Sequence, residues 1–252
     1  MNPQSWFQHQ PIPVPPQLRL YCFPYAGGGT TIYRGWQSLL TLQGLQISPI
    51  RLPGREARMR EAIPHTLQRL AKDLVDALEH NEMNIPYAFY GHSMGAMIAF
   101  EVARELRRRG LPMPVRLFVA AYTPPQMERP LSAISDIVDN DLFLEELEIR
   151  YNGVPSALKQ SAELRALFVP ILRADFNMLD HYVYQPEARL ELPIDILVGE
   201  QDQHATQDRL LGWKDQTNQI SELYLIEGGH FFINETPQSV VQIIETQLKT
   251  HL

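Results

Sequence analysis

The segment that decides the fold spans residues 87–101 and reads Tyr87-Ala88-Phe89-Tyr90-Gly91-His92-Ser93-Met94-Gly95-Ala96-Met97-Ile98-Ala99-Phe100-Glu101. Its first four residues form a short apolar run, which is typical of a buried strand, and residues 94–109 have the apolar spacing of a helix. The glycines on either side of Ser93 let the backbone turn sharply and expose the hydroxyl at the helix start. The segment therefore predicts a nucleophilic serine, with a structural turn serine as the alternative.

Further short apolar runs, bounded by glycine or proline, recur along the chain at residues 18–23, 46–52, 116–121, 194–198 and 223–226. Segments with helical spacing lie between most of these runs, among them residues 66–79 and 237–249. Thr236 before Pro237 is typical of a helix N-cap followed by proline in the first turn. Alternating strands and helices predict a mostly parallel sheet with helices on both faces.

The domain organisation follows from length and from where the alternation breaks. The chain has 252 residues, which suits one α/β domain with an insertion. Residues 1–17 contain five prolines and little periodicity, so we expect a flexible N-terminal arm before a single domain over residues 18–252. Between about residues 124 and 184, two helical stretches follow each other without a strand, which is too long for an ordinary connection.

This insertion separates the strand ending near Ala121 from the strand beginning near Ile194. It should therefore lie over the carboxyl ends of the strands, where open α/β sheets place ligands, and we interpret it as a helical lid. Pro170 is expected to kink or divide the helix predicted over residues 164–176.

Composition narrows the functional classes. Hydrophobic residues make up 44% of the chain, enough for a sizeable core, and the formal net charge of −7 gives no general attraction to nucleic acid or anionic lipid. The N-terminal residues carry no export signal and no apolar run is long enough to span a membrane, so a cytoplasmic location is expected. The single cysteine, Cys22, lies in an apolar run and is expected to be a buried thiol.

A serine hydroxyl needs a base to take its proton, and His230 is the predicted base. It follows the run at 223–226 through Glu227-Gly228-Gly229, and the paired glycines let the loop bring the ring to the serine. The alternative for His230 is a surface loop histidine. Other histidines are weaker candidates because they lie in or beside helices, at the chain end, next to Ser93 or in the loop of the predicted acid: His65, His80, His181, His251, His92 and His204.

The third member must be a carboxylate that orients the imidazole, and Asp202 is the predicted acid. The run at 194–198 leads through Gly199-Glu200-Gln201 to this residue, and Glu200 is the alternative. Some enzymes of this type place the acid one strand earlier, but the run at 116–121 is followed by no acid before Glu128.

The chain order of Ser93, Asp202 and His230 is that of the α/β-hydrolase fold. We therefore predict this fold, with a mostly parallel sheet, helices on both faces and a helical lid insertion. The mechanism needs no metal or organic cofactor, and no cluster with metal-ligand spacing is found.

Two backbone N–H groups are predicted to hold the oxyanion that forms during acyl transfer. One is that of Met94, directly after the nucleophile, and the other is that of Ala26 in the loop Pro24-Tyr25-Ala26-Gly27-Gly28-Gly29. A phosphate-binding turn is the alternative for this loop, but GxGxxG and a Walker lysine are absent.

Several segments together resemble the type II thioesterases that accompany nonribosomal peptide and polyketide synthases. They are Phe23-Pro24-Tyr25-Ala26-Gly27-Gly28-Gly29, Leu52-Pro53-Gly54-Arg55-Glu56, Gly91-His92-Ser93-Met94-Gly95-Ala96, Leu172-Arg173-Ala174-Asp175-Phe176 and Gly228-Gly229-His230-Phe231-Phe232. The resemblance extends from about Leu18 to Leu248. The departures are Tyr25, where the family often has histidine, and Gly29, where it often has serine.

The resemblance implies a stand-alone enzyme that removes misprimed or stalled acyl groups from the phosphopantetheine arm of acyl or peptidyl carrier proteins. A monomer without cofactor is expected. The alternatives are a small-ester or lipid esterase, a product-releasing thioesterase or cyclase, which is usually fused to a synthetase, and a catalytically inactive binding module. A stretch of four arginines could dock an acidic carrier, although a solvated basic stretch is the favoured interpretation: Arg51, Arg55, Arg58 and Arg60.

Overall fold

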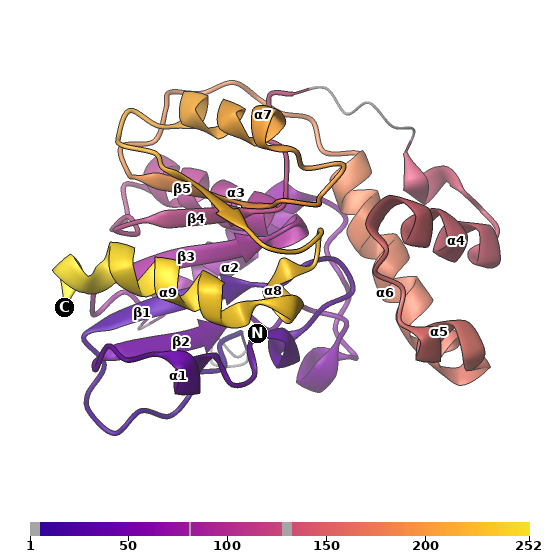
Figure 1. The fold of residues 1–252 in the computed structure, drawn as a ribbon, viewed down its shortest axis with the longest axis horizontal. Helices are drawn as coiled ribbons and strands as arrows, with labels where there is room; N and C mark the ends of the chain where they lie inside the picture. Colours follow the sequence, from indigo (N-terminus) through magenta and orange to yellow (C-terminus); the bar gives the residue numbers. More distant parts are fainter. Residues whose placement is uncertain (1–5, 81, 128–132) are drawn as a thin grey trace.

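A computed structural model describes residues 6–80, 82–127 and 133–252. Within these residues, six strands form one sheet in the order β2-β1-β3-β4-β5-β6, and each neighbouring pair is parallel. The strands are β1 (Leu18–Phe23), β2 (Leu45–Pro49), β3 (Tyr87–His92), β4 (Leu117–Ala120), β5 (Ile194–Gly199) and β6 (Leu223–Ile226). The order reverses after β2, so the connections place helices on both faces of the sheet (Figure 1).

The helices of the α/β core are α1 (Trp36–Leu39), α2 (Leu67–Glu79), α3 (Met94–Arg109), α7 (Gln207–Leu210), α8 (Phe232–Glu235) and α9 (Pro237–Leu248). The insertion contains α4 (Asn140–Tyr151), α5 (Ser156–Gln160) and α6 (Ala162–Asp180). Short 3-10 helices complete the elements at Thr30–Tyr33, Glu56–Arg58, Ile134–Asp136, Leu211–Gln216 and Lys249–His251.

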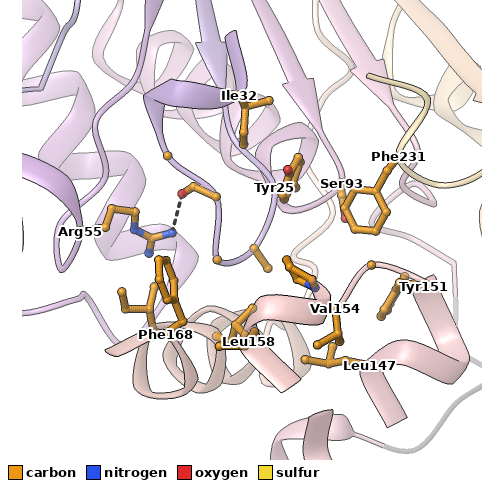
Figure 2. A pocket seen from close by; sticks show the side chains of 18 of the residues that line it. Tyr25, Ile32, Arg55, Ser93, Leu147, Tyr151, Val154, Leu158, Phe168 and Phe231 are labelled. Carbon is orange, nitrogen blue, oxygen red and sulfur yellow. Dashed lines mark hydrogen bonds between the residues drawn. The ribbon is translucent and has the colours of Figure 1, made fainter. Parts of the chain in front are cut away.

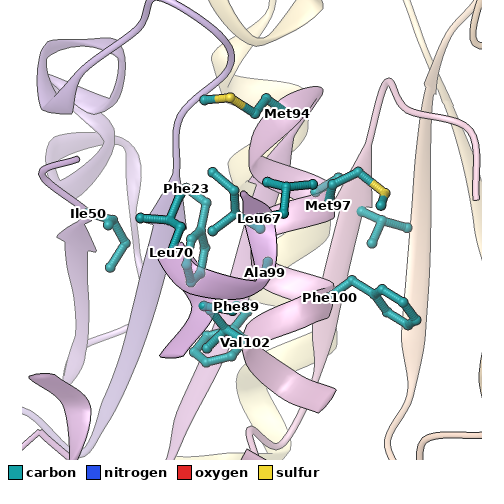
Figure 3. Close-up of a cluster of buried hydrophobic side chains, with 14 of the residues drawn as sticks. Phe23, Ile50, Leu67, Leu70, Phe89, Met94, Met97, Ala99, Phe100 and Val102 are labelled. Carbon is teal, nitrogen blue, oxygen red and sulfur yellow. The ribbon is translucent and has the colours of Figure 1, made fainter. Parts of the chain in front are cut away.

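The side chains of β1 alternate between two hydrophobic clusters, one on each face of the sheet. Tyr21 and Phe23 join the cluster that contains α2 and α3, whereas Leu20 and Cys22 join the cluster that contains α1 and α9. Cys22 is buried, as expected, and burial raises the pKa of its thiol. Figure 3 shows part of the first cluster between α2, α3 and the sheet, including Leu67, Leu70, Phe89, Met97 and Phe100.

Most predicted elements agree with the structure to within a few residues. The Thr66 side chain accepts a hydrogen bond from the backbone N–H of Arg69 and caps α2, but Thr236 at the start of α9 makes no capping bond. Strand β2 ends at Pro49 rather than at residue 52, and the next residue, Ile50, pairs with Phe7 in an isolated antiparallel bridge.

The N-terminal segment differs from the flexible arm that its prolines suggested. Trp6 and Phe7 are buried, and the N–H of Gln8 donates to the Pro49 carbonyl at 3.0 Å. The guanidinium carbon of Arg58 lies 3.6 Å from the centre of a Trp6 ring. Two aromatic side chains bury enough apolar surface to hold this segment against the sheet edge. Residues 1–5 of the predicted arm lie outside the described part of the chain.

The insertion lies beyond the carboxyl ends of the strands (Figure 1). Its described residues contain three α-helices where two helical stretches were expected, and α6 runs without division through Pro170. The neighbours of this proline, Val169 and Ile171, are buried, so packing compensates for the lost backbone hydrogen bond. Residues 128–132 of the predicted lid lie outside the described part. None of the helices described in the structure has the length and hydrophobicity needed to cross a membrane.

Candidate active site

Ser93 occupies a tight turn between β3 and α3. Its backbone has φ 53° and ψ −119°, a conformation that non-glycine residues rarely adopt and that is typical of a nucleophile turn. The turn is held by a hydrogen bond of 2.8 Å from the Ser93 N–H to the carbonyl of Ala120, at the end of the neighbouring strand β4. The serine side chain makes no capping bond to α3, so its hydroxyl stays available for other partners.

The two glycines of the turn are required by close backbone approaches. A Cβ atom at Gly91 would lie 2.2 Å from the Gly95 carbonyl oxygen, and a Cβ at Gly95 would lie 2.0 Å from the Phe23 carbonyl oxygen. Gly95 therefore lets the loop that follows β1 touch the first turn of α3. This contact brings Ala26 and Met94, the two predicted oxyanion donors, to the same edge of the sheet.

A chain of hydrogen bonds joins the three predicted catalytic side chains. His230 Nε2 lies 3.1 Å from Ser93 Oγ, and His230 Nδ1 lies 2.8 Å from Asp202 Oδ2. Because a carboxylate can only accept, Nδ1–H donates to Asp202 and Nε2 is left to accept the serine proton. The three residues come from the ends of β3, β5 and β6, and all three are buried.

Asp202 is held in its ionised form. Burial by itself raises the pKa of this carboxyl, but the hydrogen bond and charge of His230, together with the N–H groups of Ala205 and His204, outweigh burial and hold the pKa at about 2. Both amides donate to Asp202 Oδ1 at 2.9 Å. Glu200, the alternative acid, is exposed.

His92 supports the predicted base, a role that the sequence did not indicate. Its Nε2–H donates to the His230 backbone carbonyl at 2.7 Å, and the Tyr90 hydroxyl lies 3.3 Å from its Nδ1. Burial, followed by the charge of His230, lowers the pKa of His92 to about 3. The ring is therefore neutral at physiological pH and acts as a fixed donor to the loop that carries His230.

Replacing His92 with glutamine should make the free energy of unfolding depend less on pH below about pH 6.5. Between pH 6.5 and 3 the unfolded chain binds a proton at His92 that the folded chain does not, so stability rises with pH across this window. The wild type should lose about 1 kcal/mol more per pH unit than His92→Gln between pH 6 and pH 4. Urea unfolding at several pH values measures this difference, and parallel profiles would contradict the neutral His92.

The loop after β1 is a turn closed by a hydrogen bond of 2.9 Å from the Gly28 N–H to the Tyr25 carbonyl. Gly27 in this turn has φ +75°, a left-handed conformation that favours glycine. The Ala26 N–H takes no part in the hydrogen bond that closes this turn. Met94 is the first residue of α3, where backbone N–H groups lack partners within the helix.

Ser93 and His230 line a cavity of about 640 Å³ between the sheet and the insertion. Figure 2 shows Ser93, Tyr25 and Phe231 on the sheet side, and Leu147, Val154, Leu158 and Phe168 facing them from the insertion. Most of the other lining side chains are apolar as well, among them Ile32, Met59, Leu164, Ile171, Leu172 and Phe176. The cavity is suited to an apolar group next to the serine.

The insertion also contacts the predicted base directly. The Tyr151 ring, at the end of α4, lies 4.9 Å from the His230 ring between centroids. A Cβ at Gly153 would lie 2.0 Å from the Phe231 ring, so this glycine allows the insertion to approach the loop of the base. No pattern in the sequence linked these residues to the site.

The arginines of residues 51–60 do not form the solvated stretch that was favoured. Arg55 and Arg58 are both buried. Arg58 pairs with Glu61 and donates to the Arg51 carbonyl at 2.8 Å. Arg55 pairs with Asp175 at 2.7 Å, so two of the segments that carry the family resemblance, residues 52–56 and 172–176, meet at the cavity wall. Because Arg55 and Arg58 are buried, neither can dock a carrier protein.

A family model of the thioesterase domain matches residues 18–248. The chain belongs to the thioesterase family. This thioesterase is 34% identical over 247 residues to the gramicidin S biosynthesis protein GrsT of Aneurinibacillus migulanus, covering 97% of this chain and 94% of that protein. The family resemblance inferred from the motifs is confirmed.

Two solved structures agree with this thioesterase over nearly the whole chain. RedJ, a thioesterase of the prodiginine pathway in Streptomyces coelicolor, is 32% identical with a TM-score of 0.85, over 95% of this chain and 91% of that one. YbtT, a type II thioesterase from the yersiniabactin nonribosomal peptide and polyketide pathway, is 27% identical with a TM-score of 0.87, over 98% and 99%. The predicted α/β-hydrolase class is confirmed, and the thioesterase is a thioester hydrolase.

Proposed function

We propose that this thioesterase removes aberrant or stalled acyl groups from the phosphopantetheine arm of carrier proteins in nonribosomal peptide or polyketide synthesis, with Ser93, His230 and Asp202 as its catalytic triad. The observation that carries the proposal is the hydrogen-bonded chain of these side chains, with Ser93 and His230 in the wall of an apolar cavity. The gramicidin S, prodiginine and yersiniabactin relatives support the class of pathway.

The proposed reaction begins with attack of Ser93 Oγ on the thioester carbonyl carbon. The serine proton passes to His230 Nε2, 3.1 Å away, and Asp202 stabilises the resulting imidazolium. The carbonyl oxygen becomes an oxyanion that the N–H groups of Ala26 and Met94 hold. Collapse of this intermediate breaks the carbon–sulfur bond, and the pantetheine thiol leaves with the proton from His230, so that the acyl group remains on the serine as an ester.

Water completes the cycle. His230 takes a proton from the water that attacks the acyl-serine carbonyl, and returns it to Ser93 Oγ as the free acid leaves. No step calls for a metal ion or an organic cofactor, because the phosphopantetheine belongs to the carrier protein. All the proposed catalytic groups lie on one chain, so we propose a monomer that works in the cytoplasm beside its synthetase.

The cavity supports an acyl substrate of some length. Its volume of about 640 Å³ lies within the usual range for small-molecule sites, and α4, α5 and α6 supply much of its apolar wall. In this proposal the insertion acts as a lid that shields the acyl group from water. The cavity needs no cluster of cationic side chains to bind this substrate, because the acyl group and the pantetheine are both uncharged near the thioester.

The test compares thioesters on a carrier protein with simple esters. Carrier proteins loaded with acetyl, hexanoyl or decanoyl phosphopantetheine are incubated with the enzyme, and intact mass spectrometry follows the loss of the acyl mass. The p-nitrophenyl esters of the same acids are assayed in parallel. We expect a higher kcat/KM for the carrier-bound thioesters, because the arm and carrier supply binding interactions that an ester lacks.

The Ser93→Ala variant serves as the control for spontaneous thioester hydrolysis. Faster cleavage of the simple esters than of every carrier-bound thioester would contradict the proposed substrate and favour an esterase. Equal loss of acyl groups with Ser93→Ala and wild type would contradict the proposed nucleophile instead.

A further inference from the structure

A buried ion pair fastens the oxyanion loop (residues 24–29) to the insertion. The guanidinium of Arg55 donates two hydrogen bonds to the Asp175 carboxylate in α6, of 2.8 Å to Oδ2 and 2.7 Å to Oδ1. The exposed fractions of the two side chains are 5% and 0%. Arg55 Nη1 also donates to the Gly28 carbonyl at 3.0 Å, the bond drawn in Figure 2.

Asp175 holds the same loop from the other side. Its Oδ2 accepts the N–H of Gly27 at 2.8 Å, in addition to Arg55. One turn earlier in α6, Leu172 lies so close that a Cβ at Gly27 would be 2.5 Å from its Cδ2 atom. The peptide groups of Gly27 and Gly28 are thus tied to a charged pair rather than to solvent.

These bonds determine where the Ala26 N–H points. In a planar trans peptide the Tyr25 C=O and the Ala26 N–H point in opposite directions. The Tyr25 carbonyl accepts the N–H of Gly28, and the Gly28 carbonyl accepts Arg55. Fixing Gly28 therefore fixes the Tyr25–Ala26 peptide plane, and with it the direction of the Ala26 N–H.

The next residue after Arg55 secures the end of the loop. Glu56 accepts the Thr30 hydroxyl at 3.0 and 2.8 Å through its two carboxylate oxygens. Its carboxylate also fills the space in which a Cβ at Gly29 would lie, 2.4 Å from Oε1. Arg55 and Glu56 thus hold the loop at Gly28 and directly after its end, at Thr30.

We propose that Arg55 and Asp175 are positioning residues that aim the Ala26 N–H at the oxyanion, so that α6 of the insertion is part of the catalytic framework rather than a freely moving cover. The inference rests on the proposed function, in which Ala26 is an oxyanion donor. A buried ion pair contributes little to stability when compared with apolar residues of the same size. Its bonds to two glycines of the oxyanion loop give it a role in geometry instead.

The test measures hydrolysis of hexanoyl N-acetylcysteamine thioester and binding of a hexyl trifluoromethyl ketone. Ser93 Oγ adds to the carbonyl carbon of the ketone, the serine proton passes to His230, and the carbonyl oxygen becomes an oxyanion. The affinity of the ketone therefore reports on the oxyanion donors. Asp175→Asn should lower kcat by about 10- to 100-fold and ketone affinity by a similar factor. KM should change little, because the loop's donor acts on the transition state.

Two further variants separate positioning from folding. Arg55→Met with Asp175→Leu replaces the pair by apolar side chains, which should preserve the fold but still lower kcat and ketone affinity. The matched control is Asp195→Asn, in which the buried Asp195 loses its ion pair with the partly exposed Arg116, at 2.7 Å. Asp195 lies near the start of β5, at the opposite end of the strand from the site, so this variant should lose stability with kcat within about twofold of wild type.

Near-wild-type kcat and ketone affinity in the folded double variant would overturn the positioning role. A fall in kcat without a fall in ketone affinity would also overturn it, since the oxyanion donor would then be intact. Failure of the proposed triad gives a different result, in which the ketone does not inhibit the wild type and Ser93→Ala retains turnover.

Discussion

The Ser93→Ala variant should hydrolyse acyl thioesters about 10⁵- to 10⁶-fold more slowly than the wild type. No other group in the proposed mechanism can form the acyl ester, so only the oxyanion donors and substrate binding would remain to assist water. The hydroxyl bonds to His230 but does not cap α3, so its loss should change the free energy of unfolding by no more than about 1 kcal/mol.

The measurement is single-turnover loss of acyl groups from a loaded carrier protein, with urea unfolding of the same preparation to verify the fold. Turnover within tenfold of wild type in a folded Ser93→Ala protein would show that another group initiates the reaction. Ser135, another serine of the described chain but one that does not line the cavity, provides a matched control, and Ser135→Ala should leave the rate unchanged.

Asp202→Asn should lower kcat by about 10⁴-fold. The N–H groups of His204 and Ala205 both donate to Asp202 Oδ1, so an asparagine would keep its carbonyl oxygen there and turn its amide N–H toward His230. His230 Nδ1 would then have to accept, which places the ring proton on Nε2. In that tautomer the ring cannot take the proton of Ser93.

The same substitution should cost at most about 2 kcal/mol of stability at neutral pH. Asp202 has its pKa lowered from 3.8 to about 2 in the folded chain, so its ionised form stabilises the fold above pH 4 and this contribution is lost as the pH falls through 2. Glu200→Gln, at an exposed position two residues earlier, is the control and should retain wild-type kcat. If Glu200→Gln were the impaired variant and Asp202→Asn were not, Glu200 would be the acid.

The sequence allowed the sheet and the three central side chains to be predicted because both depend on local patterns. Apolar runs of four to seven residues locate strands, and loops after parallel strands meet at one edge of the sheet, so Ser93, Asp202 and His230 had to lie near one another. The α/β-hydrolase order of these residues then restricted the choice of acid and base.

The contacts that could not be predicted join segments far apart in the chain. Arg55 and Asp175 are 120 residues apart, and each alone has the sequence appearance of a solvated charge. Trp6 and Phe7 lie in a proline-rich segment whose composition suggested a loose arm, but their packing depends on a sheet edge that no local pattern reveals. Likewise, Tyr151 reaches His230 only because the insertion folds back over the strands.

The central claim is that Ser93 carries the acyl group between the carrier protein and water, and rapid acid quenching of the enzyme during turnover tests it most directly. Enzyme mixed with hexanoyl carrier protein is quenched within the first turnover, digested and examined by peptide mass spectrometry. We predict a hexanoyl adduct on the peptide that contains Ser93, formed as the carrier loses the same mass. Loss of the acyl group from the carrier with the adduct on another residue, or with no adduct at any time during the first turnover, would contradict the account.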